Sequence, residues 1–95
     1  MKRIVWDIDK ANLLALDVDR GKVTFEECVV AIEDGRLLDD VPHPSTHYKH
    51  QRLLILNINN YAYVVPYVED DTRIFFKTIF PSRKYTQLYI KEPNS

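Results

Sequence analysis

The chain has 95 residues, of which 45% are hydrophobic and 28% are charged, and its net charge is −1. This length predicts a single domain over residues 1–95 with a thin core, and no apolar run is long enough to span a membrane. The N-terminus lacks the apolar stretch of a signal peptide, and the single cysteine, Cys28, cannot form an internal disulfide. We therefore expect a cytoplasmic protein without a membrane anchor.

A short strand over residues 3–6 and a helix are predicted at the start of the chain. Asp7 is placed to cap this helix, because its carboxylate can accept the free N–H groups of the first turn. Apolar residues follow with helical spacing at Ile8, Ala11, Leu14, Ala15 and Val18. Gly21 is expected to end the helix.

A second helix is predicted to begin after Thr24. Thr24 and Glu27 fit a capping box, in which each side chain accepts the backbone N–H of the other residue. The helix is expected to end near Gly35 and to bury Phe25, Cys28, Val29 and Ile32. Residues 36–41 are a candidate short strand.

The second half of the chain predicts three strands in an antiparallel meander, over residues 51–58, 61–68 and 72–80. Asn59-Asn60 and Asp70-Asp71 supply the two turns between them. Pro66 has no N–H to donate, so it requires a sheet edge or a bulge. Ser82 is expected to cap a short final helix that runs to about residue 91.

These elements indicate an α+β fold, with a small antiparallel sheet packed by two N-terminal helices and a short C-terminal helix. Along the third meander strand, side chains alternate between the two faces of the sheet. The residues expected to face the core are Ile74, Phe76, Thr78 and Phe80. The residues expected to face outward are Arg73, Phe75, Lys77 and Ile79.

The charge is distributed unevenly along the chain. Residues 1–47 carry a net charge of −4 and residues 48–95 a net charge of +3, and residues 72–91 hold five cations and no acid. Such a segment suits an anionic partner on one face of the protein. The alternative is a solvated basic edge that prevents strand-to-strand aggregation.

Few residues suggest a metal, a cofactor or a nucleophile. His43, His47 and His50 share one loop, but no Cys or acid lies beside them in a spacing that completes a tetrahedral zinc site. Cys28 lies on the apolar face of its helix, where a thiol is normally inert. The chain has two glycines and no phosphate-binding or nucleophile-elbow motif. We expect neither a metal nor a cofactor.

The basic segment offers groups that bind phosphate. Arg83 and Lys84 lie at the N-terminal end of the final helix, where free N–H groups also favour an anion. Arg52, at the start of the meander, is expected to share a rim with Arg83. Tyr85 and Tyr89 can stack on an unpaired base or supply a hydroxyl, but for Tyr89 the favoured interpretation is that it packs the helix onto the sheet.

Four segments, taken in order, resemble the BrnT family of bacterial type II toxins. These segments are WDIDKANLLAL, VTFEECVVAIED, RLLIL and RIFFKTIFPSRKYTQLY, and the likeness covers about residues 4–91. The resemblance implies a RelE-like fold, a ribonuclease that slows growth, and a tightly bound antitoxin encoded by an adjacent gene, through which the toxin could dimerise. The matching motif positions are Trp6, Asp7, Lys10, Phe25, Glu26, Glu27, Arg52, Arg83 and Lys84.

The family often has His-Gly-Val before Phe-Glu-Glu, where this chain has Arg20-Gly21-Lys22-Val23. If that histidine contributes to cleavage, a loop histidine must replace it or the role is absent. RNA can be cut without a metal when its 2′-hydroxyl attacks the adjacent phosphate. The residues expected to serve catalysis are Arg83, Arg52, Lys10 and Glu27. The residues expected to bind RNA are Lys77, Lys84, Arg73 and Tyr85.

The general base and acid stay open between Glu26, Glu27, a loop histidine and Tyr85. A function of another class is a non-catalytic module that binds a protein through its sheet edge or through the tyrosines of the second meander strand. A DNA-binding regulator is the third alternative, but both long helices are acidic, so neither resembles a recognition helix.

Overall fold

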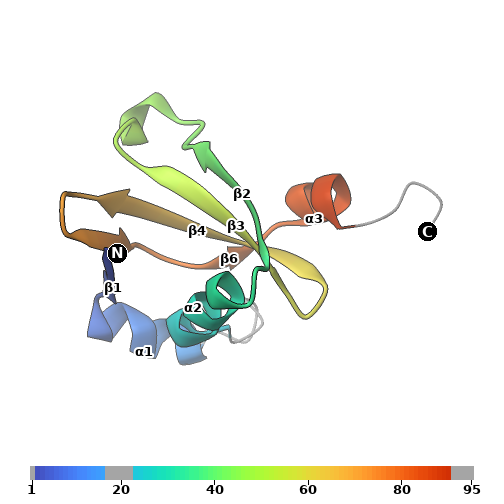
Figure 1. Cartoon of the computed structure of the whole chain (residues 1–95), viewed down its shortest axis with the longest axis horizontal. Helices are drawn as coiled ribbons and strands as arrows, with labels where there is room; N and C mark the ends of the chain where they lie inside the picture. Colours follow the sequence, from blue (N-terminus) through green and yellow to red (C-terminus); the bar gives the residue numbers. More distant parts are fainter. Residues whose placement is uncertain (1, 17–22, 91–95) are drawn as a thin grey trace.

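The structure is a computed structural model that describes residues 2–16 and 23–90. In this part of the chain one six-stranded sheet has the order β1-β5-β4-β3-β2, with β6 also paired to β4 (Figure 1). The strands are β1 (Arg3–Trp6), β2 (Leu37–Pro42), β3 (Arg52–Ile58), β4 (Tyr61–Glu69), β5 (Arg73–Phe76) and β6 (Phe80–Pro81). The helices are α1 (Ile8–Leu16), α2 (Phe25–Glu33), a 3₁₀-helix (Thr46–Tyr48) and α3 (Arg83–Tyr89).

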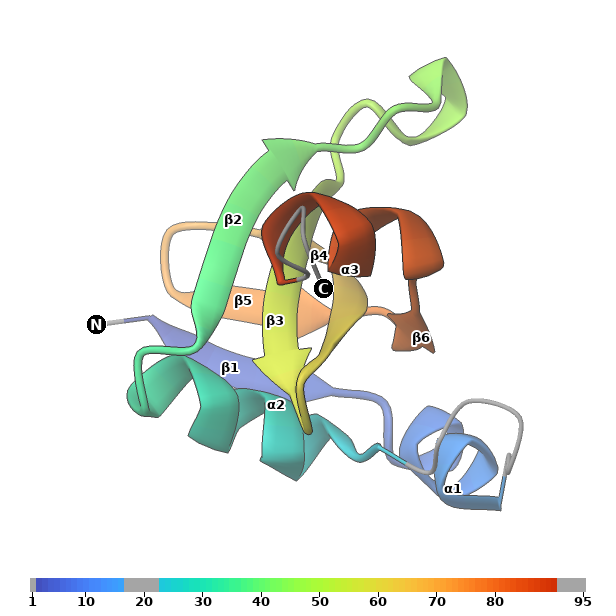
Figure 2. The same ribbon diagram turned by 90° about the vertical axis from the view of Figure 1, so that its right-hand side faces the viewer.

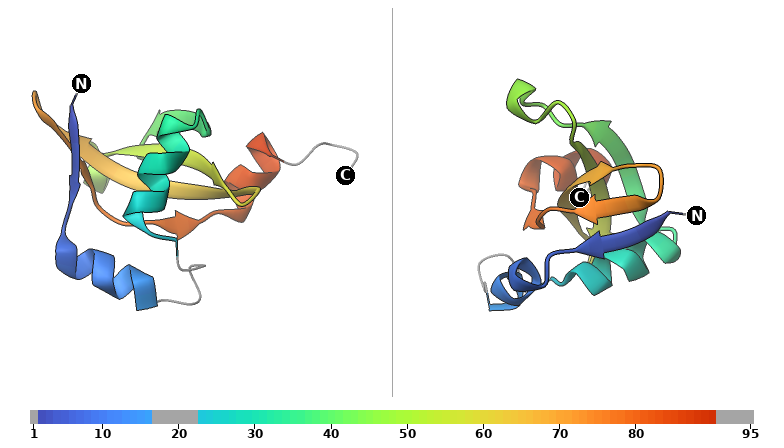
Figure 3. Two further views of the ribbon diagram at one scale, coloured as in Figure 1. Left: turned by 60° about the horizontal axis from the view of Figure 1, so that its bottom comes forward. Right: turned by 90° about the vertical axis from the view of Figure 1, so that its left-hand side faces the viewer.

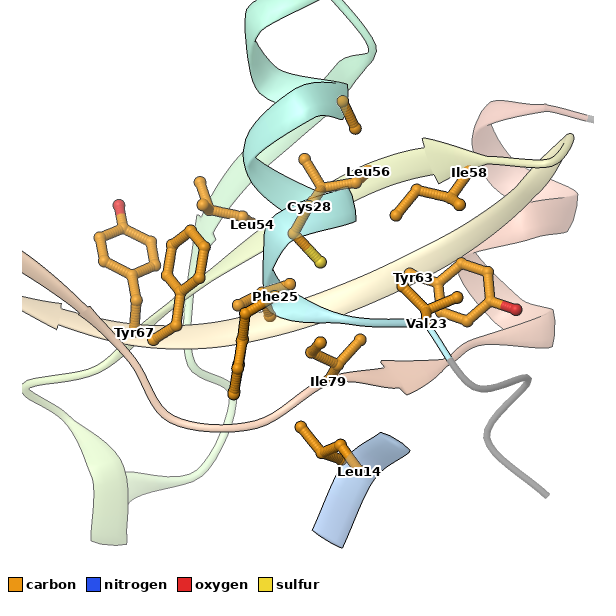
Figure 4. Close-up of a cluster of buried hydrophobic side chains, with 13 residues drawn as sticks. Leu14, Val23, Phe25, Cys28, Leu54, Leu56, Ile58, Tyr63, Tyr67 and Ile79 are labelled. Carbon is orange, nitrogen blue, oxygen red and sulfur yellow. The ribbon is translucent and has the colours of Figure 1, made fainter. Parts of the chain in front are cut away.

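The sheet is packed by helices on both faces, as Figures 1 and 2 show. On one face, α2 and Leu14 of α1 cover the larger apolar cluster, which Figure 4 shows in close-up. On the opposite face, α3 covers a smaller cluster of β3 and β4 side chains. We call these the α2 face and the α3 face. The α+β class is therefore confirmed, and the three expected helices lie on two sides of a single sheet.

All three expected helix caps are present. The Asp7 carboxylate accepts the Lys10 N–H at 3.0 Å, and Ser82 Oγ accepts the Tyr85 N–H at 3.2 Å. Thr24 Oγ1 accepts the Glu27 N–H, and the Glu27 carboxylate accepts the Thr24 N–H, so the capping box is complete. These local hydrogen bonds satisfy N–H groups that a first helical turn leaves without partners. Gly21, the expected end of α1, lies outside the described residues.

The end of α2 is set by Gly35. Its φ is +76°, and the N–H groups of Gly35 and Arg36 donate to the carbonyls of Ile32 and Ala31 at 3.1 and 2.8 Å. This is a Schellman motif, in which a left-handed residue turns the chain out of the helix. Glycine adopts that conformation without the steric conflict of a Cβ atom.

Replacing Gly35 with alanine is expected to lower the free energy of unfolding by about 1–2 kcal/mol, the steric cost of a left-handed residue that has a Cβ atom. No atom lies within 4 Å of the added Cβ, so backbone strain alone would cause the loss. Urea unfolding followed by circular dichroism measures it. Gly35→Asn is the control, because asparagine tolerates this conformation and should lose less; an equal loss in both variants would contradict this explanation.

The β3–β4 hairpin confirms the predicted two-residue turn. Asn59 and Asn60 have φ values of 56° and 64°, the positive values that a tight hairpin turn requires. Leu37–Pro42 pairs antiparallel with β3, which confirms the candidate strand before the histidine loop. Tyr63 and Tyr67 of β4 are buried on the α2 face, so the tyrosine surface suggested for a protein partner is not exposed.

The prediction of an antiparallel sheet is wrong at one edge. β1 pairs parallel with β5, with Ile4 beside Ile74 and Trp6 beside Phe76. The physical reason is hydrophobic matching, because these side chains all pack against the α2-face cluster. The Trp6 ring stacks on Phe76 with centroids 6.3 Å apart and on Phe25 of α2 at 5.3 Å. Packing between residues far apart in the chain selects this pairing, so the local pattern of strand residues could not predict it.

The predicted strand 72–80 is interrupted, and its second half has the opposite orientation. Phe76 pairs with Tyr67 and Phe80 with Val64, so three residues of this strand face two residues of β4. The extra residue is a β-bulge, which reverses the alternation of every following side chain. Ile79 is consequently buried on the α2 face and Phe80 is exposed, which corrects both of their predicted orientations.

Pro66 explains where the bulge forms. The Lys77 N–H donates to the Pro66 carbonyl at 2.8 Å, so Pro66 faces Lys77 across the ladder. An antiparallel pair of this kind normally exchanges two hydrogen bonds, and proline can supply only the acceptor. The regular ladder ends at this position, and the requirement of Pro66 for a bulge is confirmed within a central strand.

In residues 2–16 and 23–90, no helix is both long enough and apolar enough to cross a membrane.

Candidate nucleic-acid interface

Three residues of the expected basic segment lie on the α3 face. Ile74 and Phe76 pack into the α2-face cluster, so the alternating residues Arg73 and Phe75 point to the other side of the sheet. Lys77, immediately before the bulge, places its Nζ 5.0 Å from the centroid of the Phe75 ring. The outward orientation predicted for these three residues is therefore confirmed.

The parallel pairing of β1 adds a cation that the sequence analysis missed. Arg3 is the direct neighbour of Arg73, and Val5 is the neighbour of Phe75. Ile4 and Trp6 pack on the α2 face, so Arg3 and Val5 point to the α3 face. Adjacent like charges on neighbouring strands repel each other, and a bound anion would relieve that repulsion. The sequence carries no local signal for this pair, because the two arginines are 70 residues apart in the chain.

The corner between β6 and α3 holds the other two cations, Arg83 and Lys84, which are both exposed. Thr86 fixes this corner on the sheet: its buried hydroxyl accepts the Ala62 N–H at 2.8 Å and donates to the Ser82 carbonyl at 2.7 Å. Lys84 Nζ lies 5.5 Å from the centroid of the Tyr85 ring. The corner is therefore a rigid platform for two cations. α3 has seven residues, and the side chains rather than its short dipole supply the charge.

The tyrosines of α3 serve mainly in packing. Tyr85 packs against the cluster of the α3 face, and its ring stacks on that of Tyr89 with centroids 6.0 Å apart. The Tyr89 hydroxyl donates to the Asp39 carboxylate and so joins α3 to β2. This hydrogen bond lowers the pKa of Asp39 and raises the pKa of Tyr89. Of the two sequence alternatives for Tyr89, the structure favours packing.

We call the exposed cations on this side of the molecule the basic face. Its members are Arg3, Arg73, Lys77, Arg83 and Lys84. Among the described residues, Arg73 is the one member with an ion pair, at 3.3 Å to Asp70. Figure 3 shows β1 beside β5, and the chain continuing from β5 through β6 into α3.

A cavity of about 260 Å³ lies within the basic face, at the β4–β5 hairpin. Its lining residues are Val68, Glu69, Asp70, Arg73, Phe75 and Lys77. The two acidic residues of this lining are already engaged, and Glu69, which pairs with Ile74, directs its side chain to the α2 face. Glu69 forms an ion pair with Lys2 at 2.9 Å, and Asp70 accepts the N–H groups of Thr72 and Arg73 at 2.8 Å each.

These hydrogen bonds to Thr72 and Arg73 hold the pKa of Asp70 at about 2, below its ordinary value of 3.8. A lowered carboxyl pKa contributes stability that is complete above the unfolded pKa and is lost as pH falls toward the folded one. The thermal midpoint of the wild type should therefore exceed that of Asp70→Asn at neutral pH. The difference should shrink between about pH 4 and pH 2. Calorimetric scans across this range measure it, and a difference independent of pH would contradict the role of the charge.

Arg52 lies elsewhere, and the expected rim shared with Arg83 is not formed. Arg52 belongs to the α2 face, where its Nε and guanidinium NH₂ donate to the side chain and backbone carbonyl of Asp40 at 3.0 and 2.9 Å. The Tyr67 hydroxyl donates to the same carboxylate at 2.8 Å, and burial together with this hydrogen bond raises the pKa of Tyr67 to about 12. Arg52 pairs with Tyr67, whereas α3 starts beside Ala62. Five residues of strand separate them, about 16 Å.

Lys10 and Glu27 are also on the other side of the sheet from Arg83. Lys10 belongs to α1, which packs through Leu14 on the α2 face. Glu27 belongs to α2, and its carboxylate accepts the Thr24 N–H at 3.4 Å as part of the capping box. The structure thus places Arg83, Lys84, Lys77 and Arg73 of the predicted set on the α3 side of the sheet, and Arg52, Lys10 and Glu27 on the α2 side.

The remaining candidates are structural or peripheral. Cys28 is completely buried, and burial raises the pKa of its thiol to about 12. His43 accepts the Ser45 N–H at 3.1 Å, and its ring lies 4.8 Å from that of Tyr48. Among the described residues, no three side chains of His, Cys, Asp or Glu are grouped so that they could hold a metal ion.

No protein-family model matches the chain, and neither a curated protein nor a solved structure matches it.

Proposed function

We propose that the protein is a metal-independent ribonuclease that acts as the toxin of a bacterial type II toxin–antitoxin system, with a RelE-like fold. The basic face is the observation that carries this proposal. It holds five exposed cations, from β1, β5, the residue after β5 and α3, on one side of the sheet in a protein whose net charge is −1. A localised positive surface on a slightly acidic protein suits a polyanion such as RNA.

The acidic residues support the same assignment. α2 carries Glu26 and Glu27 in its first turn, and α1 carries Asp9 in its first turn. Both helices lie on the α2 face, so these three acidic residues are on the opposite side of the sheet from the basic face. A strand of RNA would be attracted to the α3 side and repelled from the other, which orients it on the protein.

Cleavage would proceed through attack of the RNA 2′-hydroxyl on the adjacent phosphate. A base takes the proton of the 2′-hydroxyl as the new oxygen–phosphorus bond forms, and the phosphate gains negative charge. The bond from phosphorus to the 5′-oxygen then breaks, and an acid donates a proton to that oxygen. Arg83 would stabilise the charge on the phosphate; its exposure, at a corner that Thr86 fixes to β4, supports this role. Lys84, Lys77 and Arg73 would hold other phosphates along the same RNA strand. Among the candidate proton-transfer groups, Tyr85 is the one within the helix of Arg83.

The proposal is tested with the purified chain and a 5′-labelled single-stranded RNA in the presence of EDTA. Products ending in 2′,3′-cyclic phosphates would establish metal-independent attack by the 2′-hydroxyl. Intact RNA after incubation with a protein that unfolds cooperatively would argue against a free ribonuclease. Adding translating ribosomes to that sample would then decide whether cleavage requires them.

A partner protein is the second part of the proposal. Three apolar side chains of α1, Ile8, Leu13 and Leu16, are 71%, 65% and 79% exposed. Exposed apolar side chains on one short helix favour a protein interface, which an antitoxin would cover. The same observation favours the alternative function, a non-catalytic module that binds a protein. In that case the substitution of basic-face residues would leave RNA unaffected, and the RNA assay above separates the two functions.

A further inference from the structure

We infer that the cavity at the β4–β5 hairpin binds one unpaired nucleobase of the RNA, stacked on the ring of Phe75. This inference rests on the proposed function, because it assigns a specific base-binding subsite within the basic face. It concerns a residue that sequence reasoning treated only as an outward-facing apolar position.

Phe75 lines this cavity and lies on a strand that has a paired neighbour on each side. Its strand neighbours on the two sides are Val5 of β1 and Val68 of β4. Both are partly buried, and both lie on the α3 face beside the ring. An aromatic ring on a central strand loses little additional freedom when a base stacks on it. The cavity volume of about 260 Å³ is slightly below the roughly 300–1,000 Å³ of pockets that enclose whole ligands, so it suits a single base.

The face of the Phe75 ring is accessible to a mobile polar group, because Lys77 Nζ lies 5.0 Å above its centroid. Lys77 is exposed, so this contact is of the weaker, solvated kind. Stacking of a base on an aromatic ring is the stronger interaction. A base would therefore displace the ammonium group from the ring, and the flexible lysine would be free to contact the phosphate of the same nucleotide.

The charges around the cavity are compatible with the binding of a negatively charged nucleotide. Asp70 is neutralised by Arg73, and Glu69 by Lys2. Arg3 lies next to Arg73 and adds a further positive charge at the cavity side. An aromatic platform bordered by cations is the arrangement by which proteins hold single strands, since each base offers a flat face and each phosphate a negative charge. A duplex keeps its bases stacked internally, so the subsite selects unpaired RNA.

The experiment compares affinities of the full chain for a fluorescein-labelled single-stranded 12-mer RNA, measured by anisotropy at several salt concentrations. The variants are Phe75→Leu, Phe75→Trp and Arg83→Ala. Phe75→Leu should weaken binding roughly 5- to 100-fold, the range for loss of one stacked base, with an unchanged salt dependence. Phe75→Trp should retain wild-type affinity and show tryptophan quenching that saturates with RNA. Arg83→Ala should reduce the slope of log affinity against log salt by about 0.7.

The outcomes distinguish failure of the base subsite from failure of the proposed function. Wild-type affinity in Phe75→Leu, together with weakened binding by Arg83→Ala, would overturn the base subsite and leave the basic face as the RNA site. Equal losses in Phe75→Leu and Phe75→Trp would also overturn it, because they indicate disturbed packing rather than lost stacking. Failure of the wild type to bind RNA would remove the proposed function itself. If Phe75→Leu also weakened the binding of a duplex of the same sequence, the subsite would not be selective for an unpaired base.

Discussion

Replacing Arg83 with alanine is expected to lower the rate of RNA cleavage about a hundredfold or more, the usual effect of removing one group that stabilises transition-state charge. Arg83 is the first residue of α3, at the β6–α3 corner where the Thr86 hydroxyl accepts the Ala62 N–H at 2.8 Å. Because Arg83 is exposed and contributes little packing, the fold should be retained. Initial rates on labelled RNA with EDTA, beside thermal unfolding of each variant, provide the measurement.

Two further variants test whether the effect is specific to the position and to the guanidinium group of Arg83. Arg36→Gln is the matched control, since Arg36 contacts Asn57 and Asp34 away from the basic face, and its cleavage rate should be unchanged. Arg83→Lys should recover only part of the activity, because an ammonium group lacks the paired donors of a guanidinium. A cleavage rate in Arg83→Ala equal to that of the wild type would exclude Arg83 from the catalytic group.

Replacing Phe76 with alanine is expected to remove about 3–5 kcal/mol from the free energy of unfolding, as for other large aromatic side chains in cores. Phe76 is 1% exposed, and its ring lies 6.3 Å from Trp6 and 6.0 Å from Phe25. It therefore joins β1, β5 and α2 at one point. Domains of this size have a total stability of about 5–15 kcal/mol, so the variant should be close to its unfolding limit. Urea unfolding at 25 °C measures the change.

Phe80→Ala is the comparison for the same change of side chain. Phe80 is 37% exposed because the bulge reverses its orientation, so its loss should be much smaller than that of Phe76. The original strand pattern placed both residues in the core and would give similar losses. Equal destabilisation of the two variants would therefore contradict the bulge, whereas a large difference would confirm the change of orientation in solution.

Loss of Phe76 also has a consequence for the candidate interface. Phe76 is the last residue of β5 in regular pairing, and Lys77 follows it at the bulge. Weak anchoring of Phe76 would release Phe75 and Lys77 from their positions on the α3 face. Core packing on one side of the sheet thus positions the basic groups on the other side, since neighbouring residues of a strand point in opposite directions.

The sequence alone determined the features that depend on near neighbours. Asp7, Thr24 and Ser82 cap their helices through hydrogen bonds that reach three residues or fewer along the chain. Asn59 and Asn60 form their turn because their short side chains tolerate positive φ, and Gly35 ends α2 for a related reason. The alternation of side chains along β5 correctly predicted which residues face outward, up to the bulge. Arg73 and Lys77 could therefore be assigned to an exposed basic surface.

Only the tertiary structure decided which of the predicted cations lie on the same side of the sheet. Arg52 is the first residue of β3 and Arg83 is the first residue of α3. The sheet lies between their side chains, and Asp40 holds Arg52 on the α2 face. Arg3 joins Arg73 through a parallel pairing across most of the chain. The bulge beside Pro66 reverses Ile79 and Phe80. The physical reason is common to all of these: strand pairing and register are selected by burial of apolar side chains distant in the chain, which no local residue pattern specifies.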